Sequence, residues 1–312
     1  MSSPKPTLAA GALAIALAAV PAVAAGSPLA VRYRRATVDG VGIFFREAGP
    51  PDAPAIVLLH GFPSSSHMFR DLIPLLATRF HVVAPDYPGF GHSDAPPPGA
   101  YRYTFDRVAE TMEALLEQLG LERYVLYLQD YGGPIGFRLA ARHPERVRGL
   151  VIQNANAYEE GLSALTREAF QAYWSDQGPE ATARVRAFLR PEGTRFQYTA
   201  GARAPEALNP DAWVLDQALL DRPGNEAIQL ALFLDYRENV ARYAAWHAYL
   251  RAHRPRTLVV WGRGDPIFLA AGAEAYRRDL PRAEIHLLDG GHFLLEEQAP
   301  AVARLILRAM AR

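Results

Sequence analysis

From residue 31 onward, apolar residues alternate between short runs typical of β-strands and longer runs at helical spacing. The segments "VRYRRATV" and "GIFFREAG" predict an opening hairpin. Later apolar runs predict strands at 55–60, 80–86, 123–130, 147–155, 256–262 and 284–289. Helical spacing predicts helices at about 68–78, at 103–120, at 133–143, between the last two strands, and from about 293 to the end.

Regular alternation of strand and helix predicts a mostly parallel central sheet with helices on both faces. The alternation of strand and helix stops between residues 157 and 250. Aromatic residues and helix formers are common there, and apolar residues no longer recur at every second position as in a β-strand. We therefore expect an α/β core made of residues 31–156 and 251–312, with an inserted helical cap at 157–250.

The N-terminus carries an apolar run, "GALAIALAAVPAVA" at 11–24, preceded by Lys5. The run is short for a bilayer span, and its Ala-Val-Ala end is typical of a secretory signal peptide. We expect residues 1–25 to be a cleaved signal, with the mature protein periplasmic or secreted and not stably inserted in a membrane. An uncleaved anchor and a disordered tail are the alternatives.

Composition narrows the function classes further. The 312 residues contain 33 Lys and Arg against 33 Asp and Glu, and this balance argues against a nucleic-acid partner. No cysteine is present, which excludes disulfides, thiolate metal ligands and a thiol nucleophile. The histidines lack the spacing of metal ligands, so no metal and no other cofactor is implied.

Four loops that follow predicted strands carry the candidate chemistry: "HGFP" at 60–63, "QDYGG" at 129–133, "GRGDPIF" at 262–268 and "DGGHF" at 289–293. Loops at the carboxyl ends of parallel strands meet at one edge of the sheet. Asp130, Asp265 and His292 occur there in the chain order nucleophile, acid, base. Each alone is a common cap or turn residue. The three together, in order and at strand ends, indicate a catalytic triad.

These motifs, together with "APDYPGFGHSDAP" at 84–96, resemble α/β-hydrolases of the haloalkane dehalogenase and epoxide hydrolase group. The resemblance runs from about residue 40 to the end and is looser in the cap. It implies the α/β-hydrolase fold, with Asp130 as nucleophile, His292 as base and Asp265 as its acid partner. It also implies that the backbone N–H groups of Phe62 and Tyr131 form the oxyanion hole.

An aspartate in place of the serine of other hydrolases changes the accessible reaction. A carboxylate that attacks an acyl carbon gives an anhydride, whereas attack on a saturated carbon displaces a halide or opens an epoxide. At its ordinary pKa of about 3.9 the carboxylate of Asp130 is ionised at neutral pH and needs no base for that step. His292 then activates a water that hydrolyses the alkyl ester.

A halide leaving group needs N–H donors, which dehalogenases of this group take from the Trp after the nucleophile and from a second Trp or an Asn. Here the first position is Tyr131, and Phe62 stands where the Asn would be. Trp174 in the cap is the candidate replacement, with packing inside the cap as the alternative.

An epoxide needs an acid for its ring oxygen, and epoxide hydrolases of this group supply it from cap tyrosines. "LDYRENV" at 234–240 resembles the segment that carries one of them, which corresponds to Tyr236. The expected register of the second falls near Phe170, and Tyr173 is the nearest tyrosine. Either tyrosine has packing in the cap as its alternative role.

The sequence thus favours an epoxide hydrolase narrowly, acting on a small apolar substrate and water. A haloalkane dehalogenase is the first alternative. A ligand-binding protein that keeps the fold without catalysis is the second, although the complete triad argues against it.

Overall fold

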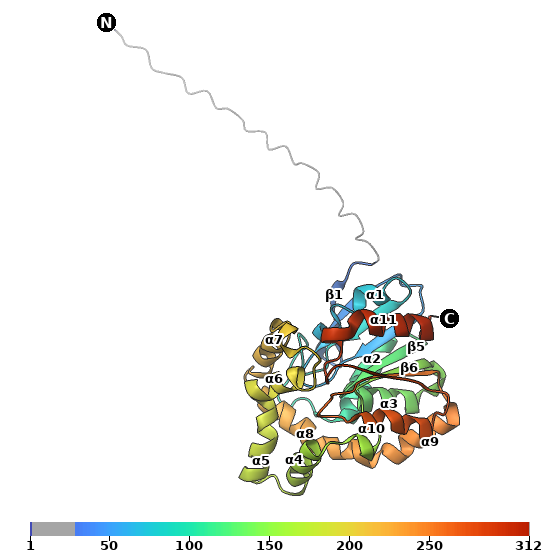
Figure 1. The fold of residues 1–312 in the computed structure, drawn as a ribbon. Coiled ribbons are helices and arrows are strands. Elements are labelled where there is room, and N and C mark those ends of the chain that lie inside the picture. Colours follow the sequence, from blue (N-terminus) through green and yellow to red (C-terminus); the bar gives the residue numbers. More distant parts are fainter. Residues whose placement is uncertain (2–28, 312) are drawn as a thin grey trace.

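The computed structural model describes Met1 and residues 29–311 (Figure 1). The signal expected at 1–25 therefore lies, apart from Met1, outside the described residues. None of the helices within the described part of the chain is long and apolar enough to cross a membrane.

Residues 29–311 form one sheet of eight strands in the order β1-β2-β4-β3-β5-β6-β7-β8. The first two strands pair antiparallel, β2 pairs antiparallel with β4, and the other pairs are parallel. The strands are β1 (Arg32–Val38), β2 (Val41–Ala48), β3 (Ala55–Leu59), β4 (His81–Pro85), β5 (Tyr124–Gln129), β6 (Val147–Gln153), β7 (Thr257–Gly262) and β8 (Glu284–Leu288). The expected opening hairpin and mostly parallel sheet are confirmed.

Helices cover both faces of the sheet, as Figure 1 shows: α1 and α11 lie on one face and α2, α3, α9 and α10 on the other. Successive residues of a strand point to opposite faces. Accordingly, Val125 and Tyr127 of β5 join the core beneath α1 and α11, whereas Leu126 and Leu128 join the core beneath α2 and α3. Burial on both faces explains why the central strands are almost wholly apolar.

The core helices are η1 (Ser66–Phe69), α1 (Ile73–Leu76), α2 (Phe105–Gln118), α3 (Gly132–Arg142), η2 (Pro144–Arg146), α10 (Ala270–Ala275), η6 (Tyr276–Arg278) and α11 (Leu295–Met310). The single helix expected at 68–78 is two short helices. Pro74 lies in the first turn of α1, where its missing N–H costs nothing, whereas the interior of one continuous helix would lose a hydrogen bond there.

The chain between β6 and β7 contains only helices, which are η3 (Glu159–Gly161), α4 (Ala164–Ser175), α5 (Pro179–Arg186), η4 (Ala187–Leu189), α6 (Pro191–Thr199), η5 (Pro205–Ala207), α7 (Asp211–Leu220), α8 (Asn225–Ala241) and α9 (Tyr243–His253). Helices α4 to α8 gather beside one edge of the sheet (Figure 1). Most of helix α9 falls within the range expected for the cap, 157–250, yet the helix packs on the core. The rings of Trp246 and Phe137 stack 5.2 Å apart there.

Candidate active site

Asp130 stands in a sharp turn between β5, which ends at Gln129, and α3, which begins at Gly132. Its backbone is left-handed, with φ of 47°, a conformation that aspartate adopts more readily than most residues. The turn is crowded: a Cβ on Gly132 would lie 2.1 Å from the carbonyl oxygen of Leu59, and one on Gly61 would lie 2.2 Å from Cβ of Asp130. Glycine at both positions lets the backbone hold the Asp130 carboxylate at the end of β5.

Two backbone N–H groups donate to the Asp130 carboxylate. The N–H of Phe62 is 2.6 Å from Oδ1, and the N–H of Tyr131 also donates to it. These are the two donors expected to form the oxyanion hole. Because they already hold an oxygen of Asp130, they would stabilise negative charge that develops on this oxygen when its ester is hydrolysed.

His292 and Asp265 meet Asp130 from the loops after β8 and β7. Nδ1 of His292 lies 2.8 Å from Oδ2 of Asp265, and Nε2 lies 3.9 Å from Oδ2 of Asp130. The side chains of His292 and Asp265 are fully buried. The structure thus brings together the three residues in which the sequence predicts a triad.

Asp265 receives further hydrogen bonds that the sequence analysis missed. The amide of Asn154, just after β6, donates to Oδ2 at 2.7 Å. The N–H groups of Ile267 and Phe268 donate to Oδ1 at 2.7 and 3.1 Å. The Asp265 carboxylate also accepts from Nδ1–H of His292, which leaves Nε2 on the side of Asp130. The sequence could have indicated Asn154, because it directly follows the predicted parallel strand that places it at the same edge of the sheet as the triad.

The environment raises the pKa of both Asp130 and His292. Burial raises the pKa of Asp130 to about 6, although the charge of His292 and the two backbone hydrogen bonds act in the opposite direction. Burial lowers the pKa of His292, but the charge and hydrogen bond of Asp265 and the charge of Asp130 outweigh it and raise the pKa above its ordinary value. The sequence analysis expected an ordinary pKa for Asp130, and the structure corrects this expectation. The carboxylate is mostly ionised at neutral pH but protonates below about pH 6.

A cavity of about 30 Å³ lies against Asp130. Its lining is mainly aromatic and includes Phe62, Tyr131, Phe170, Phe233 and Tyr236. This volume is about that of one water molecule, so a substrate needs some outward movement of the cap side chains. The apolar lining fits an uncharged electrophile.

Two phenols line this cavity. The ring centroids of Tyr131 and Tyr236 are 6.0 Å apart, and both side chains are buried. The hydroxyl of Tyr131 has no hydrogen-bond partner among the described residues. A buried hydroxyl without a partner is costly, so this one is available to a bound substrate.

The other two cap residues that the sequence singled out do not line the cavity. The hydroxyl of Tyr173 donates to the carbonyl of Leu230 at 3.4 Å, and the indole N–H of Trp174 donates to the carbonyl of Phe233 at 2.9 Å. Phe170 does line the cavity, at the register expected for the second tyrosine, but it carries no hydroxyl. The hydroxyl of Tyr173 and the indole N–H of Trp174 are therefore both bound inside the cap. Packing in the cap was the alternative role given for each residue.

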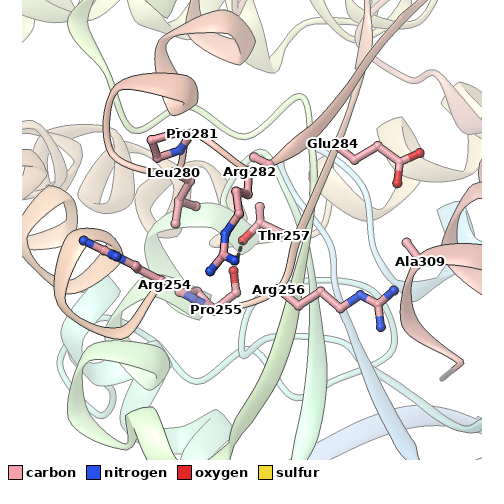
Figure 2. Close-up of a pocket in the computed structure, with 10 residues that line it drawn as sticks. Arg254, Pro255, Arg256, Thr257, Leu280, Pro281, Arg282, Glu284 and Ala309 are labelled. Atoms are coloured by element: carbon pink, nitrogen blue, oxygen red, sulfur yellow. Dashed lines mark hydrogen bonds between the residues drawn. The ribbon is translucent and has the colours of Figure 1, made fainter.

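A larger cavity, of about 400 Å³, lies where β7 and β8 begin, at the opposite end of these strands from the triad (Figure 2). Arg254, Arg256 and Arg282 line it, and Figure 2 shows no histidine or aspartate among them. It therefore holds no residue of the triad type; its lining carries the hydroxyl of Thr257 and the carboxylate of Glu284. Among residues 29–311, no group of three His, Cys, Asp or Glu side chains is placed to hold a metal ion.

With this geometry established, comparison with known proteins identifies the family. A family model described as the alpha/beta hydrolase fold matches residues 54–299. The chain belongs to this family. A hydrolase of Saccharomyces cerevisiae, described as uncharacterised, is 43% identical over 91% of this chain and 99% of its own length. A haloalkane dehalogenase of Bradyrhizobium diazoefficiens is 30% identical over 89% of this chain and 94% of its own length.

Solved α/β-hydrolases share the arrangement of most of the chain. The haloalkane dehalogenase DbeA of Bradyrhizobium elkani superposes with a TM-score of 0.73 at 26% identity, covering 89% of this chain and 96% of its own. The epoxide hydrolase CorEH superposes with a TM-score of 0.74, covering 90% and 99%, but at 21% identity it supports the fold alone. The protein is therefore an α/β-fold hydrolase, which sets aside the ligand-binding alternative.

Proposed function

We propose that this α/β-hydrolase opens epoxides to diols through a covalent ester on Asp130. The observation that carries the proposal is the place of Tyr236. Its buried side chain lines the cavity at Asp130, where a phenol can protonate the oxygen released when the ring opens. The indole of Trp174, the candidate halide donor, is already bound to the carbonyl of Phe233.

The reaction has two chemical steps. An oxygen of Asp130 forms a bond to a ring carbon as that carbon's bond to the ring oxygen breaks, and the Tyr236 proton goes to this oxygen. His292 then takes a proton from a water, and the resulting hydroxide attacks the carboxyl carbon of Asp130. The bond from this carbon to the alkyl oxygen breaks, and the departing alkoxide takes the proton from His292 to give the diol. The remaining water proton passes from the Asp130 carboxyl to the Tyr236 phenolate, which restores both residues. The N–H groups of Phe62 and Tyr131 would hold the oxyanion of this second step.

Haloalkane dehalogenation is the second candidate, and two observations favour it. Two relatives that are 30% and 31% identical over most of the chain are haloalkane dehalogenases. The unpartnered hydroxyl of Tyr131 stands next to the nucleophile and could donate to a departing halide.

The test is a screen of the purified protein on paired panels of epoxides and haloalkanes matched in carbon skeleton. We expect diol from small apolar epoxides, measured by chromatography. Halide release without diol formation would replace the proposal by the second candidate, and neither product on any pair would overturn both.

A further inference from the structure

The end of α6 and the turn after it, residues 198–204, join the cap to the two loops that carry Asp265 and His292. Gly201, in the middle of this segment, packs backbone against backbone on Gly264, the residue before Asp265. A Cβ on Gly201 would lie 1.8 Å from the carbonyl oxygen of Gly264, and one on Gly264 would lie 2.4 Å from the carbonyl oxygen of Gly201. Two backbones this close leave no room for a side chain between them.

The same segment packs against the loop of the base. A Cβ on Gly291, the residue before His292, would lie 2.7 Å from the carbonyl oxygen of Ala200. The two catalytic loops are also bonded to each other, because the N–H of Gly264 donates to the carbonyl of Gly290 at 2.9 Å. The segment therefore touches each of these loops at the residue that precedes a member of the triad.

The first residue of the segment is anchored by its side chain. The ring of Tyr198 stacks on that of Phe293, the residue after His292, with centroids 3.8 Å apart and planes 5° apart. The hydroxyl of Tyr198 donates to the carboxylate of Asp216 on α7. These side chains are buried, so water does not compete for the hydrogen bond.

The last residues of the segment are anchored by their backbone. The N–H groups of Arg203 and Ala204 donate to the two carboxylate oxygens of Glu297, at 3.1 and 3.0 Å. Hydrogen bonds to an ionised acceptor are stronger than neutral ones. Glu297 belongs to the first turn of α11, the helix that follows the loop of His292. The segment is thus held against the core at both ends, with its middle on the two catalytic loops.

We propose that residues 198–204 are a positioning element of the active site, with Gly201 as its closest contact, which holds Asp265 and His292 in place against Asp130. The inference rests on the proposed two-step reaction at Asp130, in which only hydrolysis of the ester uses His292. Placement matters because a shift of about 1 Å in a catalytic group can lower a rate about 100-fold. The nucleophile follows β5, whereas the contact of Gly201 is with the loop after β7.

Gly201→Ala is the variant that tests the contact. Its Cβ must displace the carbonyl of Gly264, and its left-handed φ of 74° adds backbone strain. Gly224→Ala is the matched control. Gly224 also lies in the cap with a left-handed φ, of 85°, but no atom lies within 4 Å of the place of its Cβ. The control therefore has the same kind of backbone strain without the contact.

The experiment uses rapid mixing at pH 8, with the member of the paired epoxide and haloalkane panels that the wild type converts fastest. It separates formation of the alkyl-enzyme from its hydrolysis. Gly201→Ala should slow ester hydrolysis about 10- to 100-fold and leave alkyl-enzyme formation within about threefold, so that the intermediate accumulates. Gly224→Ala should keep wild-type rates in both steps.

Glu297→Gln carries the test if Gly201→Ala fails to fold. The change keeps the shape of the side chain but sets an amide NH₂ where one of the two backbone N–H groups needs an acceptor. The end of the segment is then held more loosely. We expect a smaller loss, about threefold to tenfold, in ester hydrolysis alone.

The outcomes separate this inference from the proposed function. An equal loss in both steps of Gly201→Ala, or the same loss in Gly224→Ala, would show that the segment only supports the cap, and unchanged ester hydrolysis in Gly201→Ala, or in Glu297→Gln where the first does not fold, would show that it positions nothing. Each overturns the inference. If the wild type consumes only haloalkanes, the proposed epoxide hydrolysis fails, while the positioning role is measured on their alkyl-enzyme.

Discussion

Nε2 of His292 lies 3.9 Å from Oδ2 of Asp130, close enough for a strong electrostatic interaction but too far for a direct hydrogen bond. In the proposed reaction, His292 at this distance leaves the carboxylate free to attack in the first step. The same ring nitrogen faces the carboxyl group at which the proposed second step takes place. This spacing suits two successive reactions at one carboxylate better than a single proton transfer between the two residues.

The two-step scheme predicts opposite effects of its two central residues. Asp130→Ala should abolish turnover, whereas His292→Gln should accumulate an alkyl-enzyme, because only ester hydrolysis needs the base. Intact-mass measurement shows the adduct, and its mass identifies the substrate class. An epoxide adds its whole mass, whereas a haloalkane adds its mass less that of the hydrogen halide.

His286→Gln is the control for this pair, since His286 lies on β8, bonded to Glu284 and not to the triad. It should keep normal turnover. If His292→Gln accumulates no adduct with a substrate that the wild type consumes, the covalent scheme is wrong.

Substitution of single tyrosines should distinguish an epoxide hydrolase from a haloalkane dehalogenase. In an epoxide hydrolase, Tyr236→Phe should lower the rate of alkyl-enzyme formation about 10²- to 10⁴-fold, while substrate binding changes little. Tyr173→Phe should have a small effect, because its hydroxyl is bound to the carbonyl of Leu230. Near-normal turnover of Tyr236→Phe beside a crippled Tyr131→Phe would instead identify a dehalogenase that uses Tyr131 as halide donor.

The raised pKa of Asp130 predicts a pH limit on the first step. Only the ionised carboxylate is a nucleophile, and its pKa is about 6. The rate of alkyl-enzyme formation in the wild type should therefore be constant above that pH and fall about tenfold per pH unit well below it. Stopped-flow measurements between pH 4.5 and 8, in the range where the fold is intact by circular dichroism, test this. A rate independent of pH across the range would contradict the assignment.

The same pKa predicts a stability cost of the site. The pKa of Asp130 is about 6 in the folded chain against 3.8 for an ordinary aspartate, so the folded state binds more protons between these values. Stability then falls as pH rises through this window, by about 3 kcal/mol at most. Asp130→Asn should therefore unfold at a higher denaturant concentration than the wild type at pH 8, with a smaller difference at pH 5. An equal difference at both pH values would contradict the argument.

The N-terminal segment predicts export. Expressed in a Gram-negative host, the mature protein should begin near Ala25 or Gly26 and be recovered from the periplasm. N-terminal sequencing of the periplasmic fraction tests this. An unprocessed chain that begins at Met1 in the soluble cytoplasm would end the proposal.

The order of strands and loops in the sequence was sufficient to predict the fold and to bring Asp130, Asp265 and His292 together. Parallel strands place their carboxyl ends at one edge, so residues more than a hundred positions apart converge once each is known to follow a strand. The glycines beside Asp130 were equally visible in the sequence, because a turn this tight admits no side chain there.

Only the tertiary structure decided what surrounds the triad. Tyr173 and Phe170 are three residues apart on α4, so they lie on one helix face, and no pattern tells which of them reaches the cavity. The stacking of Tyr198 on Phe293 joins the cap to the loop of the base through residue types that suit many other roles. The pKa of Asp130 depends on burial beneath a cap whose packing the sequence leaves open. Each is a matter of which side chains the cap buries together, and that is settled by packing in three dimensions.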